Sequence, residues 1–185
     1  MKEDYWYWNN YLSLNDRKLV IDYIDNNYDF YEDKSLFNSN IKNTDDVKCI
    51  SWNNINKLNV INKMIDEVLT VNQKNFGYNI YPLRTHNPFN LTVYSSSKKA
   101  SYDWHRDQSI DNLLDIKLTG ILNLSTEVYE GGEFLFNRGV ESVVPQFAKG
   151  GDMILFKSHI LHKVSPVTKG TRKTLTFFLE GPRFV

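Results

Sequence analysis

Two ionisable side chains separated by one residue form the first chemical pattern in this sequence. His105 and Asp107 lie in the run Tyr-Asp-Trp-His-Arg-Asp at positions 102–107. Residues i and i+2 of a β-strand project from the same face of the sheet. If this run is a strand, the imidazole and the carboxylate point the same way and supply two ligands for one metal ion.

Candidates for a third ligand lie far downstream, where His159 and His162 both fall in the run from Phe156 to Val164. Two histidines and one carboxylate form the facial triad that holds non-haem Fe(II) and leaves its other coordination positions open. A count of histidines does not decide between His159 and His162. The residue types therefore predict an iron site whose third ligand must be chosen on other grounds.

The composition indicates one folded domain spanning residues 1–185, with a helical N-terminal part over about 1–75 and a β core over about 78–182. Hydrophobic residues make up 41% of the chain, and no apolar run approaches the roughly 18 residues that a membrane span needs. The 22 Lys and Arg balance the 22 Asp and Glu, which argues against a nucleic-acid or anionic-lipid partner. Residues 1–8 do not resemble a secretion signal, so we expect a cytoplasmic protein. Cys49 is the only cysteine, which excludes an internal disulfide and a cysteine-based zinc site.

Helical spacing of apolar residues is confined to the first part of the chain. Ser13 and Asp16 have the spacing of a capping box ahead of a predicted helix over about 14–26. A loop with a short edge strand should follow to residue 46, and then a strand over 47–52. A second helix, capped by Asn53 or Asn54 and running to about residue 72, is marked by Leu58, Ile61, Ile65 and Val68.

From Tyr78 onward the apolar period changes to two, which predicts strands separated by turns. The predicted strands are 78–83, 90–95, 101–106, 116–125, 133–136, 140–144, 152–156, 161–165 and 172–180. On the last of them Leu175, Phe177 and Leu179 alternate with Arg172, Thr174 and Thr176. The apolar face suits a cover of helices, and the polar face suits an interior cavity that holds a metal and a charged small molecule.

The predicted fold is therefore mainly β, of the α+β class. We expect a double-stranded β-helix, that is, a cupin-like jelly roll, with the N-terminal helices packed on the outside of one sheet.

At this point the sequence resembles the Fe(II)- and 2-oxoglutarate-dependent dioxygenases, in particular the prolyl-4-hydroxylase-like branch that includes the PKHD-type hydroxylases. The resemblance covers about residues 88–182 and depends on the order and spacing of six motifs. These are Tyr-Asp-Trp-His-Arg-Asp (102–107), Leu-Asn-Leu-Ser (122–125), Tyr-Glu-Gly-Gly-Glu-Phe-Leu-Phe (129–136), Gly-Asp-Met-Ile-Leu-Phe (151–156), His-Lys-Val-Ser-Pro-Val (162–167) and Gly-Thr-Arg (170–172).

The resemblance implies a role for each candidate site residue. His105, Asp107 and His162 would bind Fe(II), because His162 rather than His159 precedes the Val-x-Pro-Val pattern of the family. Arg172, ten residues after His162, would hold the distal carboxylate of 2-oxoglutarate with its planar fork of donors. Tyr94 resembles a family tyrosine that helps to bind the same co-substrate.

Two further features of the resemblance concern the turn before Phe134. Gly131 and Gly132 suit a tight turn or a close backbone approach beside the site. Phe134 departs from the collagen-type enzymes, which have Thr at that position, so part of the co-substrate pocket stays unassigned.

The implied reaction consumes dioxygen and 2-oxoglutarate, releases succinate and CO₂, and hydroxylates an unactivated C–H bond, with ascorbate as a reductant. Proline, either free or within a peptide, is the substrate that the resemblance favours. Halogenation is disfavoured because Asp107 fills the position that a halide would need. Two alternatives stay open: a nucleobase-demethylating dioxygenase, which should show a basic groove, and a non-catalytic jelly-roll module, such as a sugar-binding domain.

Overall fold

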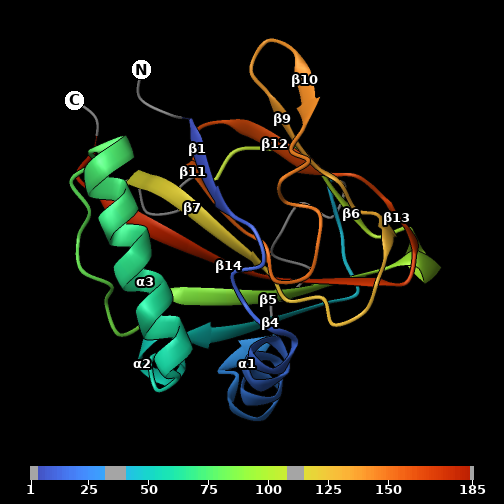
Figure 1. The fold of residues 1–185 in the computed structure, drawn as a ribbon, viewed down its shortest axis with the longest axis horizontal. Coiled ribbons are helices and arrows are strands. Elements are labelled where there is room, and N and C mark those ends of the chain that lie inside the picture. The colour runs from blue at the N-terminus through green and yellow to red at the C-terminus, as the bar shows by residue number, and fades with distance from the viewer. Residues whose placement is uncertain (1–3, 32–40, 108–114, 184–185) are drawn as a thin grey trace.

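Two antiparallel sheets face each other in the computed structural model, which describes residues 4–31, 41–107 and 115–183 (Figure 1). The larger sheet has the order β1-β11-β7-β14-β5-β4-β2 and the smaller has the order β10-β9-β12-β6-β3. The larger sheet contains β1 (Tyr5–Trp8), β11 (Met153–Lys157), β7 (Asp115–Asn123), β14 (Thr171–Gly181), β5 (Pro88–Ser95), β4 (Asp46–Ser51) and β2 (Phe30–Tyr31). The smaller contains β10 (Glu141–Val143), β9 (Phe134–Asn137), β12 (Leu161–Val164), β6 (Ser101–His105) and β3 (Lys42–Asn43). This arrangement confirms the predicted jelly roll.

A further pair of short strands, β13 (Val167–Lys169) and β8 (Glu130–Gly131), forms a separate two-stranded sheet, in which β13 contacts β5 of the larger sheet. In β8 and the residue after it, Gly131 and Gly132 have positive φ angles of 71° and 62°. A Cβ on Gly131 would lie 2.3 Å from the carbonyl oxygen of Pro166. The two glycines therefore combine a turn with a close backbone approach, as the sequence predicted.

The helices cover the outer face of the larger sheet (Figure 1). They are α1 (Leu14–Asn27), α2 (Trp52–Ile55) and α3 (Asn59–Val71), and α3 continues into a π-helical turn, η1 (Asn72–Phe76). A short 3-10 turn, η2 (Ser96–Lys98), follows β5. Ser13 caps α1 as predicted, because its hydroxyl accepts a hydrogen bond from the Asp16 amide at 3.2 Å. Among the described residues, no helix has both the length and the apolar character needed to cross a membrane.

The second predicted helix is divided in two. Leu58 adopts an extended conformation, with φ −84° and ψ 113°, and separates α2 from α3. Neither Asn53 nor Asn54 caps it, because both lie inside α2. The break buries Ile55 and Leu58 together with the apolar face of α3, so packing overrides the continuous helical pattern.

Alternation along β14 separates two cores. Leu175, Phe177 and Leu179 pack with the helices on the outer face, while Arg172 and Thr174 are buried on the opposite face, between the two sheets. The inner face of β7 adds further buried polar side chains, those of Thr119 and Asn123. These polar side chains lie beside a second apolar cluster, which includes Ile121, Phe134 and Phe156. The interior between the sheets is therefore only partly apolar, and its buried polar groups need partners.

Three local predictions differ from the structure. Residues 78–83 form no strand. The Tyr81 amide donates a hydrogen bond to the Glu180 carbonyl in β14, but the segment does not form the repeated backbone hydrogen bonds of a paired strand. Strand β1 was not predicted, because its aromatic run has no alternation, yet it pairs with β11 at the sheet edge. The segment up to residue 46, where a loop with one short edge strand was expected, contains two such strands, β2 and β3, each at an edge of its sheet, and residues 32–40 lie outside the described residues.

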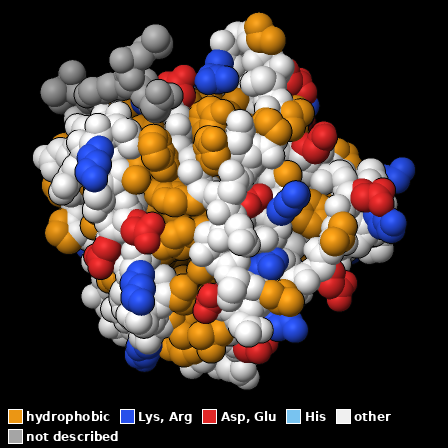
Figure 2. Space-filling view, viewed as in Figure 1, with side chains coloured by type: hydrophobic (Ala, Val, Ile, Leu, Met, Phe, Trp, Pro, Cys, Tyr) orange, Lys and Arg blue, Asp and Glu red, His pale blue; other side chains and the backbone are white. Residues whose placement is uncertain are grey.

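The face seen in Figure 2 carries a band of hydrophobic side chains, flanked on both sides by Lys and Arg interspersed with Asp and Glu. The mixing of the two signs of charge matches the balanced composition. This face therefore has no continuous basic tract of the kind that binds a phosphate backbone.

Candidate metal centre

Three of the predicted side chains converge between the sheets. One ligand atom from each of His105, Asp107 and His162 lies within 4.8 Å of the other two. His105 ends β6 and is paired with His162 on the neighbouring β12. Asp107 lies two residues beyond the end of β6, with its Oδ1 3.8 Å from Nε2 of His105 and its Oδ2 3.5 Å from Nε2 of His162. These distances leave room for one ion between the three side chains.

Both imidazoles are fixed by hydrogen bonds to backbone carbonyls. Nδ1 of His105 donates to the carbonyl of Asp103 at 2.7 Å, and Nδ1 of His162 donates to that of Ile160 at 2.9 Å. A proton on Nδ1 leaves the lone pair of Nε2 directed at the centre, as in metal-binding histidines. Burial lowers the pKa of each imidazole to about 4, and the nearby His162 contributes to the lowering for His105. Both rings are neutral at pH 7, the form that binds a metal.

The carboxylate of Asp107 is positioned by two residues that the sequence analysis did not assign to the site. The Thr119 hydroxyl on β7 donates to Oδ2 of Asp107 at 2.7 Å and lies 2.9 Å from the Ser158 hydroxyl. The Asp107 amide donates to the Ser158 carbonyl at 3.1 Å. Burial raises the pKa of Asp107, against the lowering effects of the His105 charge and the Thr119 hydrogen bond. A bound cation would offset this burial cost.

An irregularity in β6 adds an aromatic ring to the centre. His105 pairs with His162, but the next pair on β12 joins Val164 to Tyr102, so β6 contains an extra residue at this point. The bulge turns both Tyr102 and His105 inward, and their rings stack with centroids 3.6 Å apart. Strict alternation would have placed Tyr102 on the other face from His105, so this contact could not be predicted from the sequence.

Arg172 lies on β14 in the same interior, with 1% of its surface exposed. Its guanidinium carbon is 5.4 Å from the ring centroid of Tyr94 and 5.6 Å from that of Phe147. A Cβ on Gly132 would come within 2.8 Å of the Arg172 Cδ, so the glycine lets the backbone close against this side chain. Within the described part of the chain, Nε and Nη2 of Arg172 have no hydrogen-bond partner. The planar guanidinium of Arg172 can therefore donate two hydrogen bonds to a carboxylate group of a ligand.

Tyr94 is 4% exposed and pairs with Arg172 across β5 and β14. The structure therefore brings Tyr94 and Arg172 together by ring-face contact. His159, by contrast, is exposed in the turn after β11, and the Nε of Arg106 donates to its carbonyl oxygen at 2.9 Å. Its imidazole does not belong to the cluster of three, so the geometry agrees with the choice of His162 as the third ligand.

These residues fit Fe(II) and a dicarboxylate. Two neutral imidazoles and one carboxylate are the ligands of a facial iron site, and the unpaired fork of Arg172 supplies a partner for a distal carboxylate. Buried polar atoms without partners are rare in folded proteins, so the unpaired Nε and Nη2 of Arg172 are the clearest sign that this interior binds an anionic ligand.

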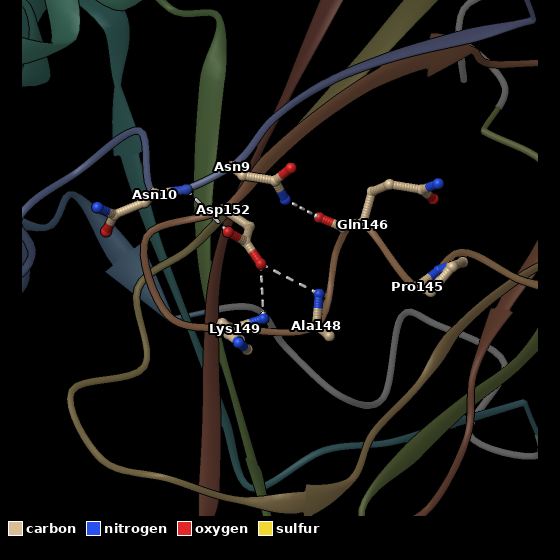
Figure 3. Close-up of a pocket in the computed structure, with 7 residues that line it drawn as sticks. All are labelled: Asn9, Asn10, Pro145, Gln146, Ala148, Lys149 and Asp152. Atoms are coloured by element: carbon tan, nitrogen blue, oxygen red, sulfur yellow. Dashed lines mark hydrogen bonds between the residues drawn. The ribbon is translucent and has the colours of Figure 1, made fainter.

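A surface pocket of about 460 Å³ lies elsewhere and is lined by Asn9, Asn10, Pro145, Gln146, Ala148, Lys149 and Asp152 (Figure 3). Both carboxylate oxygens of Asp152 are occupied, because they accept hydrogen bonds from the backbone amides of Asn10, Ala148 and Lys149. Asp152 thus holds the loop whose Phe147 packs against Arg172. This pocket contains none of the candidate ligands, and we assign it a structural role.

Comparison with known proteins matches the 2OG-Fe(II) oxygenase superfamily over residues 89–180, a segment that includes all five predicted site residues. A PKHD-type hydroxylase of Synechococcus sp. (strain CC9605) is 32% identical over 93 residues, which are 49% of this chain and 41% of that protein. A PKHD-type hydroxylase of Saccharophagus degradans is 41% identical over 67 residues, or 36% of this chain and 29% of that protein. The match thus spans less than half the length of these curated relatives.

Solved structures show the same fold at low sequence identity. A prolyl-4-hydroxylase from Pseudomonas putida superposes with a TM-score of 0.67 at 16% identity, covering 98% of this chain and 94% of that one. A viral collagen prolyl hydroxylase from Paramecium Bursaria Chlorella virus-1, in a complex with 2OG, gives 0.66 at 15% identity and covers 97% of each chain. Fold and sequence pattern agree, and this chain belongs to the 2OG-Fe(II) oxygenase superfamily, whose members use Fe(II) and 2-oxoglutarate.

Proposed function

We propose that this chain is an Fe(II)- and 2-oxoglutarate-dependent dioxygenase that hydroxylates an unactivated C–H bond of a prolyl residue or a free amino acid. The observation that carries the proposal is the presence, in one interior, of three clustered ligand atoms and a buried arginine with unpaired donors. A metal site alone would serve many functions. Arg172, which can bind a carboxylate, is the residue that indicates a keto acid as co-substrate.

His105, Asp107 and His162 hold Fe(II) in this proposal, and Arg172 binds the distal carboxylate of 2-oxoglutarate, with Tyr94 beside it. Bound together, the metal and the keto acid supply the oxidising chemistry: one atom of dioxygen enters succinate as CO₂ is lost, and the other enters the substrate. The backbone carbonyls of Asp103 and Ile160 keep both imidazoles in the ligand tautomer.

Support for a proline-like substrate comes from the relatives. The curated relatives are PKHD-type hydroxylases, and several structural neighbours are prolyl hydroxylases, one of them in a complex with a peptide fragment. The fold alone does not choose a substrate, because one fold supports many reactions. The proposal therefore names proline and related amino acids as the first compounds to test.

The test measures succinate from 2-oxoglutarate with added Fe(II), together with a mass-spectrometric search for a gain of one oxygen across free amino acids and proline-containing peptides. Asp107→Ala should abolish succinate formation while the unfolding temperature stays close to that of the wild type. Removing a buried carboxylate relieves a burial cost in the metal-free protein, so the fold should tolerate the change. Normal succinate formation by Asp107→Ala would contradict the metal assignment.

A further inference from the structure

Asn90 on β5 faces the interior between the sheets. Its sequence neighbours Phe89 and Leu91 belong to the core beneath the helices, so Asn90 projects from the opposite face. It pairs with Thr176 on β14, whose alternation places Thr176 on the same face as Arg172. The side chain of Asn90 therefore lies on the inner face of the larger sheet, the face that also carries Arg172 and Thr119.

The amide of Asn90 has an unsatisfied acceptor. Its Oδ1 atom is buried and has no hydrogen-bond partner in the described structure. Asn123 provides a contrast on the same inner surface, because its Nδ2 donates to the Tyr129 hydroxyl at 2.8 Å and its Oδ1 accepts from the Ser125 amide at 3.1 Å. A buried acceptor left unpaired costs about 1–3 kcal/mol, so a position that keeps one is a candidate for binding a ligand.

The strand register places Asn90 away from both Thr119 and Arg172. Thr176 pairs with Asn90 on one side and with Ile121 on the other, so Asn90 is two strands, or about 10 Å, from β7. Along the strand direction, Asn90 is two residues, or about 7 Å, from the level of Thr119, which supports Asp107. Arg172 lies four residues, or about 13 Å, from Thr176 in the other direction. A keto acid that runs from the metal towards Arg172 leaves Asn90 free.

We infer that Asn90 binds the primary substrate and that this substrate presents an N–H donor, as a free amino acid does with its ammonium group. The inference rests on the proposed function and narrows its substrate class. A carbonyl oxygen only accepts hydrogen bonds, so its partner must be a donor. The ring nitrogen of a prolyl residue within a peptide carries no N–H, whereas free proline and other free amino acids carry at least two on the same nitrogen.

The first test separates a binding role from a structural one without knowledge of the substrate. Asn90→Leu removes an unpaired polar group, so the unliganded protein should unfold at the same or a higher temperature. The matched control Asn123→Leu breaks two hydrogen bonds and should unfold at a clearly lower temperature. In calorimetry with the Mn(II)-loaded protein, Asn90→Leu should bind 2-oxoglutarate within about twofold of the wild type. Destabilisation like that of Asn123→Leu, or a tenfold loss of 2-oxoglutarate affinity, would overturn the inference.

The second test uses a pool of free L-amino acids that includes L-proline, and a pool of the corresponding acetylated derivatives without any N–H, namely N-acetylproline and the N-acetyl-N-methyl derivatives of the other amino acids. The free pool should stimulate succinate formation and gain oxygen, whereas the acetylated pool should do so at least about tenfold less. The stimulation should fall by about tenfold or more in Asn90→Leu, the effect of losing one hydrogen bond to a charged group. Equal stimulation by both pools, or none by either, would overturn the substrate class. Wild-type protein that forms no succinate under any condition would instead refute the proposed function, while the first test would still show whether Asn90 has a structural role.

Discussion

Replacement of Arg172 by leucine should separate ligand affinity from fold stability. Nε and Nη2 of Arg172 are the unpaired donors of the described cavity, and each can donate to one oxygen of a carboxylate. A hydrogen bond to a charged group contributes about 1.5–3 kcal/mol. Loss of two such bonds, at the lower value, amounts to about 3 kcal/mol, or about a 150-fold rise in the Kd for 2-oxoglutarate.

The unliganded protein should lose little stability from the same change. Removing the unpaired donors relieves a burial cost of about 1–3 kcal/mol. The loss of ring-face contacts with Tyr94 and Phe147, at about 0.5–2 kcal/mol each, acts in the opposite direction. We therefore expect the free energy of unfolding to change by less than about 2 kcal/mol. A structural role in a buried ion pair would cost about 3–5 kcal/mol instead.

Calorimetric titration of the Mn(II)-loaded protein measures this prediction directly. 2-Oxobutanoate, a keto acid without the distal carboxylate, should bind the wild type and Arg172→Leu with equal affinity. Lys173→Leu, which removes a positive charge from the next residue on the opposite face of β14, should bind 2-oxoglutarate normally. An unchanged Kd for 2-oxoglutarate in Arg172→Leu, or an equal loss of affinity for both keto acids, would refute the assignment.

Three further predictions concern the metal. His162→Ala should abolish binding of Fe(II) and 2-oxoglutarate decarboxylation, whereas His159→Ala should retain both; the reverse result would show that the third ligand is wrongly chosen. Thr119→Val keeps the side-chain shape but removes the hydrogen bond to Asp107, and it should weaken metal binding by about 10- to 100-fold in a competition assay; unaltered affinity would show that the contact is not needed. The third prediction concerns pH. The pKa of His105 and of His162 is lowered to about 4, so neither imidazole holds a proton above about pH 5, while the pKa of Asp107 is raised. Between pH 7 and 5, each unit of acidification should therefore lower the Zn(II) affinity by no more than about tenfold, because Asp107 is the one ligand whose pKa is raised and at most one proton can be released. A steeper slope would mean that the histidines titrate in this range.

The sequence predicted those parts of the molecule that depend on alternation and on motif spacing. The face of β14 that carries Leu175 and Phe177 packs under the helices, and the face that carries Arg172 lines the interior, as expected from a strict period of two. His105 and His162 likewise come together on two neighbouring strands, β6 and β12, whereas Asp107 joins them from beyond the end of β6. In both cases the signal is local or is repeated along one strand.

Contacts that depend on irregular backbone or on distant pairing could not be predicted in this way. Tyr102 reaches His105 through a bulge, which breaks the alternation on which the prediction relied. Ser158 lies in a turn and supports Asp107 partly through its backbone carbonyl, a contact that any residue type could make. Asn90 occupies an ordinary polar position in the alternation of β5. It is distinguished by its buried Oδ1 atom, which has no hydrogen-bond partner in the described structure and cannot be recognised from the sequence.

The position of β14 has a consequence for how the chain acquires its fold during synthesis. This last strand lies in the middle of the larger sheet, between β7 and β5, both of which precede it in the chain. Until β14 leaves the ribosome, β7 and β5 each have one unpaired edge. Strand β1 likewise cannot pair until β11, which is about 150 residues later in the chain, has been synthesised. Sheets built from such distant pairings fold slowly and expose edges on which chains aggregate. A nascent chain that ends before Thr171 already contains His105, Asp107 and His162, yet it lacks the strand that completes the floor beneath them. Iron should therefore bind stably at this site only after β14 has paired with β7 and β5.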